Sequence, residues 1–365
     1  MPQALGELDS CLQRLAAGGR PPGALLAVRR DGALVFERAY GVAQRPEAGV
    51  PERPLRTDTI FDLGSITKVV VTTAAVMSLV QAGALDLEAP VSSWLDGFAG
   101  PDKRRVTLVH LLTHRAGLWE WWPVYFRARD RAAAIEFVCA LDLRYPVGAG
   151  RHYSDLGFML LGEIVRRATG EELDAVARRL VLDPLGMRDT GFLPAPALRP
   201  RIAATSRGDR HERAMVATGD PYPVREDPAQ FRGWREHTLV GEVNDGNAHH
   251  AFGGIAGHAG LFSTARDLAA FGQAFLAGGA GVWDAATVQR FTRDHTDPGQ
   301  GLGFWTRRHA GLGFGHGGFP GTELLVLPER GLVVVLLTNR LHARGQASPI
   351  DAPWRDVLRI VTVVH

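Results

Sequence analysis

The chain has 365 residues, of which 45% are hydrophobic and 22% charged, and its formal net charge is +2. That content can bury a large core in one domain or two lobes, and the interspersed charges exclude a basic stripe for nucleic acid or a cluster for anionic lipid. Only Cys11 and Cys139 occur, which excludes a disulfide framework and leaves a single bridge open. The first residues lack the basic and apolar regions of a signal peptide, and no apolar run suits a membrane span, so we expect a cytoplasmic protein.

Segments at the two ends of the chain predict one antiparallel sheet. Runs 22–30 and 33–40 flank Asp31-Gly32, a strong hairpin signal. Strand-like runs separated by turn residues follow near the C-terminus, at 301–308, 311–319, 323–327 and 331–338. We expect these runs to pair with the hairpin, and a helix over about 351–363 to cover one face of the sheet.

The middle of the chain is dominated by helical periodicity, as in runs 156–168, 171–180 and 265–276. The fold class is therefore α+β: an α/β/α sandwich with a central antiparallel sheet and an inserted helical lobe. We assign residues 1–85 and 286–365 to the discontinuous sheet domain and 86–285 to the lobe. Segment 198–247 is polar and weakly periodic, which predicts a long surface excursion near the cleft, with a mobile loop as the alternative.

Lysine usage gives the first indication of chemistry. Of the 41 lysine and arginine residues only Lys68 and Lys103 are lysines, and Lys68 lies three residues after Ser65. Arginine stays protonated, whereas a buried lysine can act as a base. The apolar run 66–80 predicts a buried helix, which places Ser65 and Lys68 on one face at its positive N-terminal end as nucleophile and base. For a lone Ser-x-x-Lys, a capping serine and a surface lysine would be the commoner explanation.

Two further motifs accompany this pair. Tyr153 stands on a turn just before a helix, where a phenol close to a lysine could relay a proton; the alternative is a ring packed on the core. His316 lies in a glycine-dense strand whose backbone could approach a substrate closely, and an N–H from that strand could complete an oxyanion hole with the N–H of Ser65. A bulged edge strand explains the glycines equally well.

The histidines near residue 250 do not form a convincing zinc motif. His249, His250 and His258 are close in the sequence, but their spacing favours surface or structural roles. His258, with Asp245 and Asn247, could still line a cleft, so we keep His258 and Asn247 as candidate substrate-binding residues.

The order Ser-x-x-Lys, Tyr-Ser-Asp and His-Gly-Gly resembles the serine β-lactamase and penicillin-binding-protein-like hydrolases, in particular the class C β-lactamase-related group of esterases, amidases and D-amino-acid peptidases. The runs Leu-Leu-Thr-His-Arg-Ala-Gly-Leu at 111–118, Pro-Leu-Gly-Met at 184–187 and Gly-Leu-Phe-Ser-Thr-Ala at 260–265 also look like that family. The resemblance implies a β-lactamase/transpeptidase-like fold without a metal or other cofactor. It implies that Ser65 is acylated, that Lys68 and Tyr153 share the acid/base work, and that the N–H groups of Ser65 and Phe319 form the oxyanion hole.

Two positions depart from the family pattern. His316-Gly317-Gly318 stands where penicillin-recognising members have Lys-Thr-Gly, which weakens the cation that holds a substrate carboxylate. Asp155 stands where the second motif usually has Asn, and an ionised carboxylate can only accept hydrogen bonds. Asp155 could instead pair with Lys68, hold that lysine protonated and move the base role toward Tyr153. The candidate substrate-binding residues at these two motifs are Asp155, His316, Gly317 and Gly318.

We therefore expect a serine hydrolase that cleaves a small ester or amide through an acyl-enzyme, with neither nucleic acid nor membrane as a partner. A β-lactamase or D-amino-acid peptidase is one alternative, disfavoured by the missing third-motif lysine and by the absent signal peptide. A catalytically silent ligand-binding homologue is another. The sequence leaves the substrate open, because specificity depends on loops such as 119–122 and 198–247.

Overall fold

The central element of the computed structural model is a seven-stranded antiparallel sheet in the order β3-β2-β1-β10-β9-β8-β7. The structure describes residues 2–47, 50–224, 226–309, 312–345, 347, 349 and 351–362. The strands are β1 (Gly23–Arg30), β2 (Ala33–Gln44), β3 (Arg53–Pro54), β7 (Trp305–His309), β8 (Leu312–Gly318), β9 (Thr322–Leu327) and β10 (Leu332–Thr338). The predicted pairing of the N-terminal hairpin with the C-terminal strands is confirmed, because β1 lies between β2 and β10.

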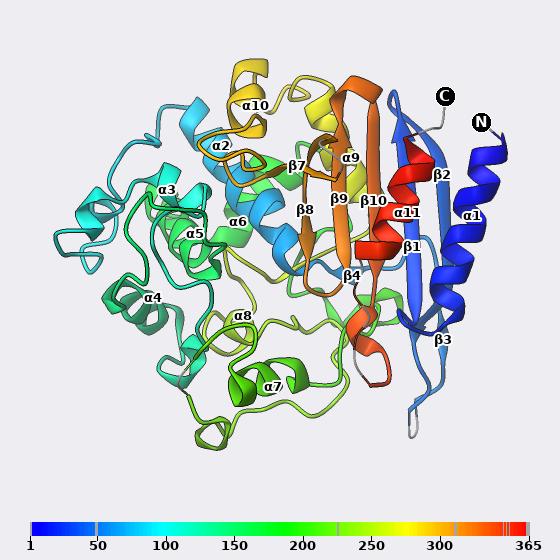
Figure 1. Ribbon diagram of the computed structural model, residues 1–365, viewed down its shortest axis with the longest axis horizontal. Coiled ribbons are helices and arrows are strands. Elements are labelled where there is room, and N and C mark those ends of the chain that lie inside the picture. The colour runs from blue at the N-terminus through cyan, green and yellow to red at the C-terminus, as the bar shows by residue number, and fades with distance from the viewer. Residues whose placement is uncertain are drawn as a thin grey trace.

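Helices cover both faces of this sheet (Figure 1). Successive strand residues point to opposite faces, so Leu26 and Val28 pack into one apolar cluster and Leu25 and Ala27 into another. On the first face lie α1 (Pro2–Ala17) and α11 (Asp351–Val361), and on the second lies α9 (Ala265–Leu276). The closing helix is thereby confirmed as far as residue 361; residues 363–365 lie outside the described residues.

A helical region lies beside the sheet (Figure 1) and contains α2 (Ala74–Gln81), α3 (Leu108–Leu112), α4 (Arg131–Ala140), α5 (Asp155–Thr169), α6 (Leu173–Ala177) and α10 (Ala285–Thr292). The predicted core helix is one continuous helix in three parts: a 3₁₀ turn at Gly64–Ile66, a π-helical segment at Lys68–Thr73, and α2. Length and composition alone would allow residues 64–81 to cross a membrane, but 78% of that helix is buried inside the protein. It is a core helix that carries Ser65 and Lys68 between the lobe and the sheet.

Two expectations about the middle of the chain need correction. Helix α9 falls within 86–285, yet it packs on β1, β9 and β10 and so belongs to the sheet layers. Segment 198–247 includes α7 (Arg210–Thr218) and buried charged side chains, and α8 (Gly246–His250) begins at its end, so it is not a simple surface loop.

A second sheet has three strands: β4 (Phe61–Asp62), β6 (Leu261–Ser263) and β5 (Gly191–Phe192). The chain passes from β4 directly into the helix of Ser65.

Candidate active site

Ser65 is placed by the turn that joins β4 to the core helix. Gly64 has φ 53°, and a Cβ there would lie 2.5 Å from Pro320 Cδ and 3.3 Å from the Phe319 nitrogen. Only glycine accepts both that backbone conformation and that approach. The Asp62 carboxylate accepts a hydrogen bond from the Gly64 N–H at 2.9 Å, which fixes the turn. Ser65 consequently lies beside the residue that follows β8.

Lys68 lies one helical turn further and is completely buried. Its Nζ is 2.8 Å from Ser65 Oγ, 2.7 Å from Asp155 Oδ1 and 3.0 Å from the His258 carbonyl oxygen. Burial by itself would lower the pKa of Lys68, but the Asp155 carboxylate and Tyr153 outweigh it and raise that pKa above its ordinary value. The pairing of Asp155 with Lys68 follows the sequence-based interpretation, and the resting lysine is an ammonium.

Tyr153 completes the group around Ser65. Lys68 Nζ lies 5.1 Å from the centre of its ring, and the phenol hydrogen-bonds to Ser65 and Lys68. Burial raises the pKa of Tyr153, and the opposing effects of Lys68 and of the hydrogen bond with Ser65 do not cancel that increase. The resting site therefore holds a neutral phenol beside an ammonium–carboxylate pair.

The glycine-dense strand β8 packs directly against the chain that leads to Ser65. A Cβ on Gly318 would overlap the Leu63 carbonyl oxygen, and that oxygen also accepts a hydrogen bond from Thr322 Oγ1 at 2.9 Å. The close approach of these two segments explains the glycine at 318. It brings the backbone of Phe319 next to the backbone of Gly64 and Ser65, as an oxyanion hole requires.

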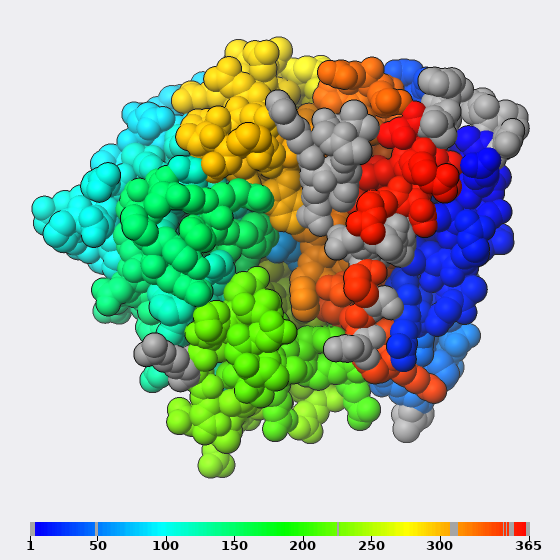
Figure 2. Space-filling view, viewed as in Figure 1, coloured from blue at the N-terminus to red at the C-terminus, as the bar shows by residue number. Residues whose placement is uncertain are grey.

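Ser65 and Tyr153 open into a cleft of about 450 Å³, and Figure 2 shows a hollow on this face between the green surface and the orange strands. Trp121 and Tyr222 stack on one another at 5.8 Å in its wall, and Phe319, 46% exposed, lies at its edge. Arg340 stands over the Phe319 ring and donates a hydrogen bond from Nε to the Phe319 carbonyl at 2.9 Å. The ionisable side chains in the described lining are Tyr153, Tyr222, Arg340, Asp62, Asp155, Glu212, Asp245 and Glu323.

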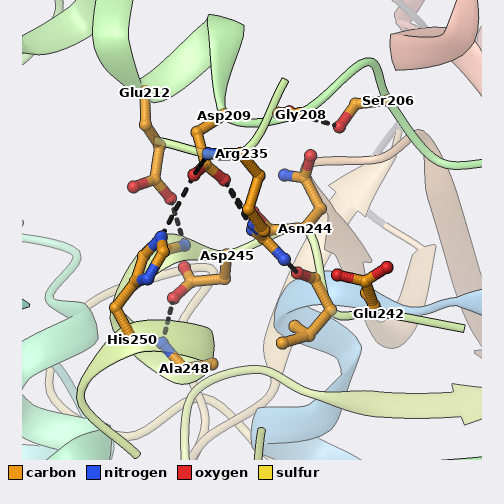
Figure 3. A network of polar contacts seen from close by, with 12 residues as sticks. Ser206, Gly208, Asp209, Glu212, Arg235, Glu242, Asn244, Asp245, Ala248 and His250 are labelled. Carbon is orange, nitrogen blue, oxygen red and sulfur yellow. Dashed lines mark hydrogen bonds and ion pairs between the residues drawn. The ribbon is translucent and has the colours of Figure 1, made fainter. Parts of the chain in front are cut away.

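A buried ion pair joins distant parts of segment 198–247 to one another (Figure 3). Arg235 Nη2 lies 2.6 Å from Asp209 Oδ1, and Arg235 also donates to the carbonyls of Val243 and Asn244. His250 Nε2 contacts the other Asp209 oxygen at 3.1 Å. Burial alone would raise the pKa of Asp209, but His250 and Arg235 lower it to about 2. This charge pairing adds to the apolar side chains that the segment contributes to the core, such as Ile202 and Phe231.

The same segment places two carboxylates in the cleft. Glu212 accepts hydrogen bonds from the Gly246 N–H at 2.6 Å and the Tyr125 hydroxyl at 2.9 Å. Burial and the nearby Asp245 raise the pKa of Glu212 well above its ordinary value. Asp245 accepts from the Ala248 N–H at 2.7 Å, and its Oδ1 lies 3.0 Å from His258 Nε2. Although burial opposes it, His258 lowers the pKa of Asp245, so the ionised group of this pair is Asp245.

The candidate substrate-binding residues divide into two groups. Asp155, Gly317 and Gly318 line the cleft as expected. His316 does not: its side chain is 1% exposed and stacks on Trp305 at 3.9 Å, with Nδ1 2.7 Å from the Gly317 carbonyl oxygen. Trp305 lines the cleft and His316 does not, while the imidazole lies 5.9 Å from the Tyr153 ring, so a role of His316 toward substrate stays a prediction.

The side chains of Asn247 and His258 contact other parts of the protein. Asn247 is fully buried, accepts from the Val124 N–H at 2.7 Å and donates to the Trp122 carbonyl at 2.9 Å, so its amide binds backbone instead of substrate. The buried His258 contacts Asp245 with its ring and Lys68 with its carbonyl. Both residues support the site from outside the described cleft lining.

Several lining residues were not identified from the sequence. Asp62 lies three residues before Ser65 and could have been noticed as a cap of that turn. Glu212 and Arg340 stand far from the three motifs and are brought to the cleft only by tertiary structure, whereas Glu323 lies on the next strand, opposite Gly317. No described group of three or more His, Cys, Asp or Glu side chains could hold a metal ion. Cys11 and Cys139 are both buried, free thiols.

Comparison with known proteins identifies the family. The model of the family described as Beta-lactamase matches residues 8–354. The chain belongs to the β-lactamase family. It is 34% identical to the N-acetylmuramyl-L-alanine amidase of Bacillus subtilis (strain 168), over 93% of this chain and 81% of that protein. It is 31% identical to a putative D-alanyl-D-alanine carboxypeptidase of Salmonella schwarzengrund, over 96% of this chain and 85% of that protein.

Solved structures show the same fold. The D-amino acid amidase of Ochrobactrum anthropi SV3 superposes with a TM-score of 0.74 at 22% identity and covers 99% of both chains. EstCE1, described as a hydrolase with promiscuous acyltransferase activity, superposes with a TM-score of 0.73 at 22% identity and covers 98% of both chains. The β-lactamase/transpeptidase-like fold implied by the sequence motifs is thereby confirmed.

Proposed function

We propose that this protein is a serine hydrolase that cleaves an amide or ester through an acyl-enzyme on Ser65. The observation that carries the proposal is the contact of 2.8 Å between Lys68 Nζ and Ser65 Oγ, where the cleft of a β-lactamase-family fold meets the buried core helix. A serine beside a buried lysine at a helix N-terminus is the arrangement that an activated nucleophile needs.

The proposed acylation step uses the groups already in contact. Lys68 stays an ammonium held by Asp155 at 2.7 Å, and Ser65 passes its hydroxyl proton to the Tyr153 oxygen while Tyr153 passes its own phenolic proton toward the leaving group. The Ser65 Oγ forms a bond to the substrate carbonyl carbon, and the N–H groups of Ser65 and Phe319 stabilise the negative oxygen. When the bond to the leaving group breaks, that group departs with the proton from Tyr153, and Tyr153 is left neutral because it keeps the proton of Ser65. In deacylation, a water molecule in the place of the leaving group gives a proton to Tyr153 as its oxygen bonds to the acyl carbon; the bond to Ser65 Oγ breaks, Tyr153 returns a proton to Ser65, and the acid is released.

The substrate class that we propose first is the amide bond of an N-acetylmuramyl-L-alanine type of compound. Its support is the relative with that name, which is 34% identical over 93% of this chain. The cleft is large enough for a small glycopeptide, and the stacked Trp121 and Tyr222 offer an aromatic edge on which a sugar ring can pack.

A D-alanyl-D-alanine carboxypeptidase is the second candidate, and one observation favours it. Arg340 is the only Arg or Lys side chain in the described lining of the cleft, and it lies at the Phe319 end, close to the proposed oxyanion hole. A guanidinium there suits a terminal carboxylate.

A substrate panel distinguishes these candidates. Purified protein is incubated with N-acetylmuramyl-L-alanine, a D-alanyl-D-alanine peptide, p-nitrophenyl butyrate and nitrocefin, each with wild type and Ser65→Ala. We expect amide cleavage at the muramyl–alanine bond and ester turnover, both lost in Ser65→Ala. Faster release of D-alanine would favour the second candidate, and rapid nitrocefin opening a β-lactamase. Binding without turnover, unchanged in Ser65→Ala, would replace the proposal with a silent ligand-binding protein.

A further inference from the structure

The turn after α3 contains a buried histidine with an unusual backbone. His114 is 2% exposed and has φ 57°, one of four described non-glycine residues with a positive φ. A non-glycine residue in the left-handed region is uncommon, although histidine adopts it more readily than most side chains, and such positions concentrate at functional sites. The surroundings of His114 therefore need a specific explanation.

His114 binds the chain on both sides of Tyr153. Its carbonyl oxygen accepts a hydrogen bond from the His152 N–H at 2.8 Å, and its imidazole Nδ1 accepts one from the Ser154 N–H at 2.9 Å. Between these two bonds, the Tyr153 ring lies 4.6 Å from the imidazole, centre to centre. His114 thus contacts Tyr153 and both of the residues next to it in the chain.

The second of these bonds fixes the protonation state of His114. Nδ1 can accept from Ser154 only when the ring is neutral with its proton on Nε2, because a doubly protonated ring would present a donor to a donor. Burial and the Lys68 ammonium lower the pKa of His114 well below its ordinary value, which keeps the ring neutral. The imidazole can therefore serve as a permanent acceptor beside a cationic site.

The residues that follow His114 extend the same support to Asp155. The Trp119 carbonyl accepts from the Ser154 hydroxyl at 2.6 Å, and the Glu120 carbonyl accepts from the Asp155 N–H at 2.9 Å. Those two acceptors are backbone oxygens, which substitutions leave in place. The imidazole of His114 is the part of this support that a substitution can remove.

We propose that His114 is a positioning residue for Tyr153, holding the phenol beside Ser65 and Lys68 through its bonds to the two flanking residues. His114 is not a catalytic residue, since it is absent from the described lining of the cleft. The proposal rests on the proposed function, in which Tyr153 transfers a proton.

The test compares two substitutions that both tolerate the positive φ. His114→Gly removes the imidazole without adding backbone strain, whereas His114→Asn keeps an acceptor oxygen close to the position of Nδ1. Each variant is labelled at Ser65 with a fluorophosphonate, and KM and kcat are measured on p-nitrophenyl butyrate. Amide hydrogen exchange of residues 152–155 is followed by mass spectrometry in the same proteins.

Loss of a hydrogen bond to a buried N–H should slow labelling and kcat by roughly tenfold to a hundredfold in His114→Gly, with KM nearly unchanged. The same variant should show faster exchange at 152–155, and His114→Asn should restore all three measurements most of the way to wild type. If His114→Gly does not fold, His114→Asn alone is compared with wild type, and it must keep wild-type labelling, kcat and exchange for the proposal to stand.

Equal impairment of the Asn and Gly variants, or a Gly variant that matches wild type, would overturn the role of His114. A wild-type protein that the fluorophosphonate does not label would instead count against Ser65 as nucleophile. In that case, amide hydrogen exchange at residues 152–155 would still test whether His114 holds Tyr153 in place, because this measurement does not depend on activity.

Discussion

The ion pair between Lys68 and Asp155 has a consequence for stability that can be measured. Asp155 Oδ1 lies 2.7 Å from Lys68 Nζ, and the two side chains are 15% and 0% exposed. Asp155→Asn keeps the shape of the side chain but leaves a buried ammonium without its counter-charge. Removing one member of a buried pair costs about 3–5 kcal/mol of the free energy of unfolding, provided that the remaining charge persists.

The pH dependence of that loss follows from the direction of the pKa shift. The pKa of Lys68 is raised in the folded protein above its ordinary value of 10.5, so the pair contributes fully below that pH and loses its contribution as the pH rises through the raised pKa. In Asp155→Asn, burial is no longer opposed by the carboxylate, and the pKa of Lys68 falls. The difference in stability between the two proteins should therefore be largest near pH 6–7 and shrink toward pH 10.

Urea unfolding at a series of pH values measures this difference. Asp297→Asn is the matched control, because Asp297 pairs with Arg115 at 2.5 Å but is 31% exposed, and such a partly exposed pair is worth about 0–1 kcal/mol. If Asp155→Asn cost no more than the control, or if its cost grew with rising pH, the description of Lys68 as a buried ammonium would be wrong.

Three further predictions concern the surroundings of the site. In Gly318→Ala, the new Cβ would collide with the Leu63 carbonyl oxygen and displace the Phe319 N–H from the oxyanion hole. We expect kcat to fall by about 10²–10³-fold while the circular dichroism spectrum stays the same. An unchanged kcat would contradict that role for the strand. Arg235→Met removes the guanidinium that faces the buried Asp209 and should cost about 3–5 kcal/mol in urea unfolding, whereas a loss below about 1 kcal/mol would show that the pair does not hold the parts of the segment together. Burial raises the pKa of Asp62 from 3.8 to about 6, so the free energy of unfolding should fall by about 3 kcal/mol as the pH rises from 4 to 6. Asp62→Asn should make the free energy of unfolding less dependent on pH in this range. An equal pH dependence in the variant would refute the raised pKa of Asp62.

The parts that the sequence predicted are those set by local spacing. A hairpin follows from Asp31-Gly32, because that pair suits a tight turn between two apolar runs. Ser65 and Lys68 share a face because they are three residues apart on one helix. Two roles for Asp155 were open from the sequence, contact with substrate or with Lys68, and the structure shows the contact with Lys68.

The parts that the sequence did not predict depend on contacts between distant segments. Polarity suggested that segment 198–247 lies on the surface, but Asp209 and Arg235 are polar because they neutralise one another inside the protein. Asn247, His258 and His316 have side chains typical of substrate contacts, yet tertiary packing turns each of them toward backbone, a carboxylate or an aromatic ring. No pattern in one chain distinguishes a polar side chain that supports a cleft from one that lines it.

Intact-mass analysis during turnover of p-nitrophenyl butyrate tests the central claim most directly. We predict a protein that gains the mass of one butyryl group, a modified peptide that contains Ser65, and loss of both the adduct and the turnover in Ser65→Ala. Turnover that persists in Ser65→Ala, or an adduct on a peptide without Ser65, would contradict the acyl-enzyme mechanism.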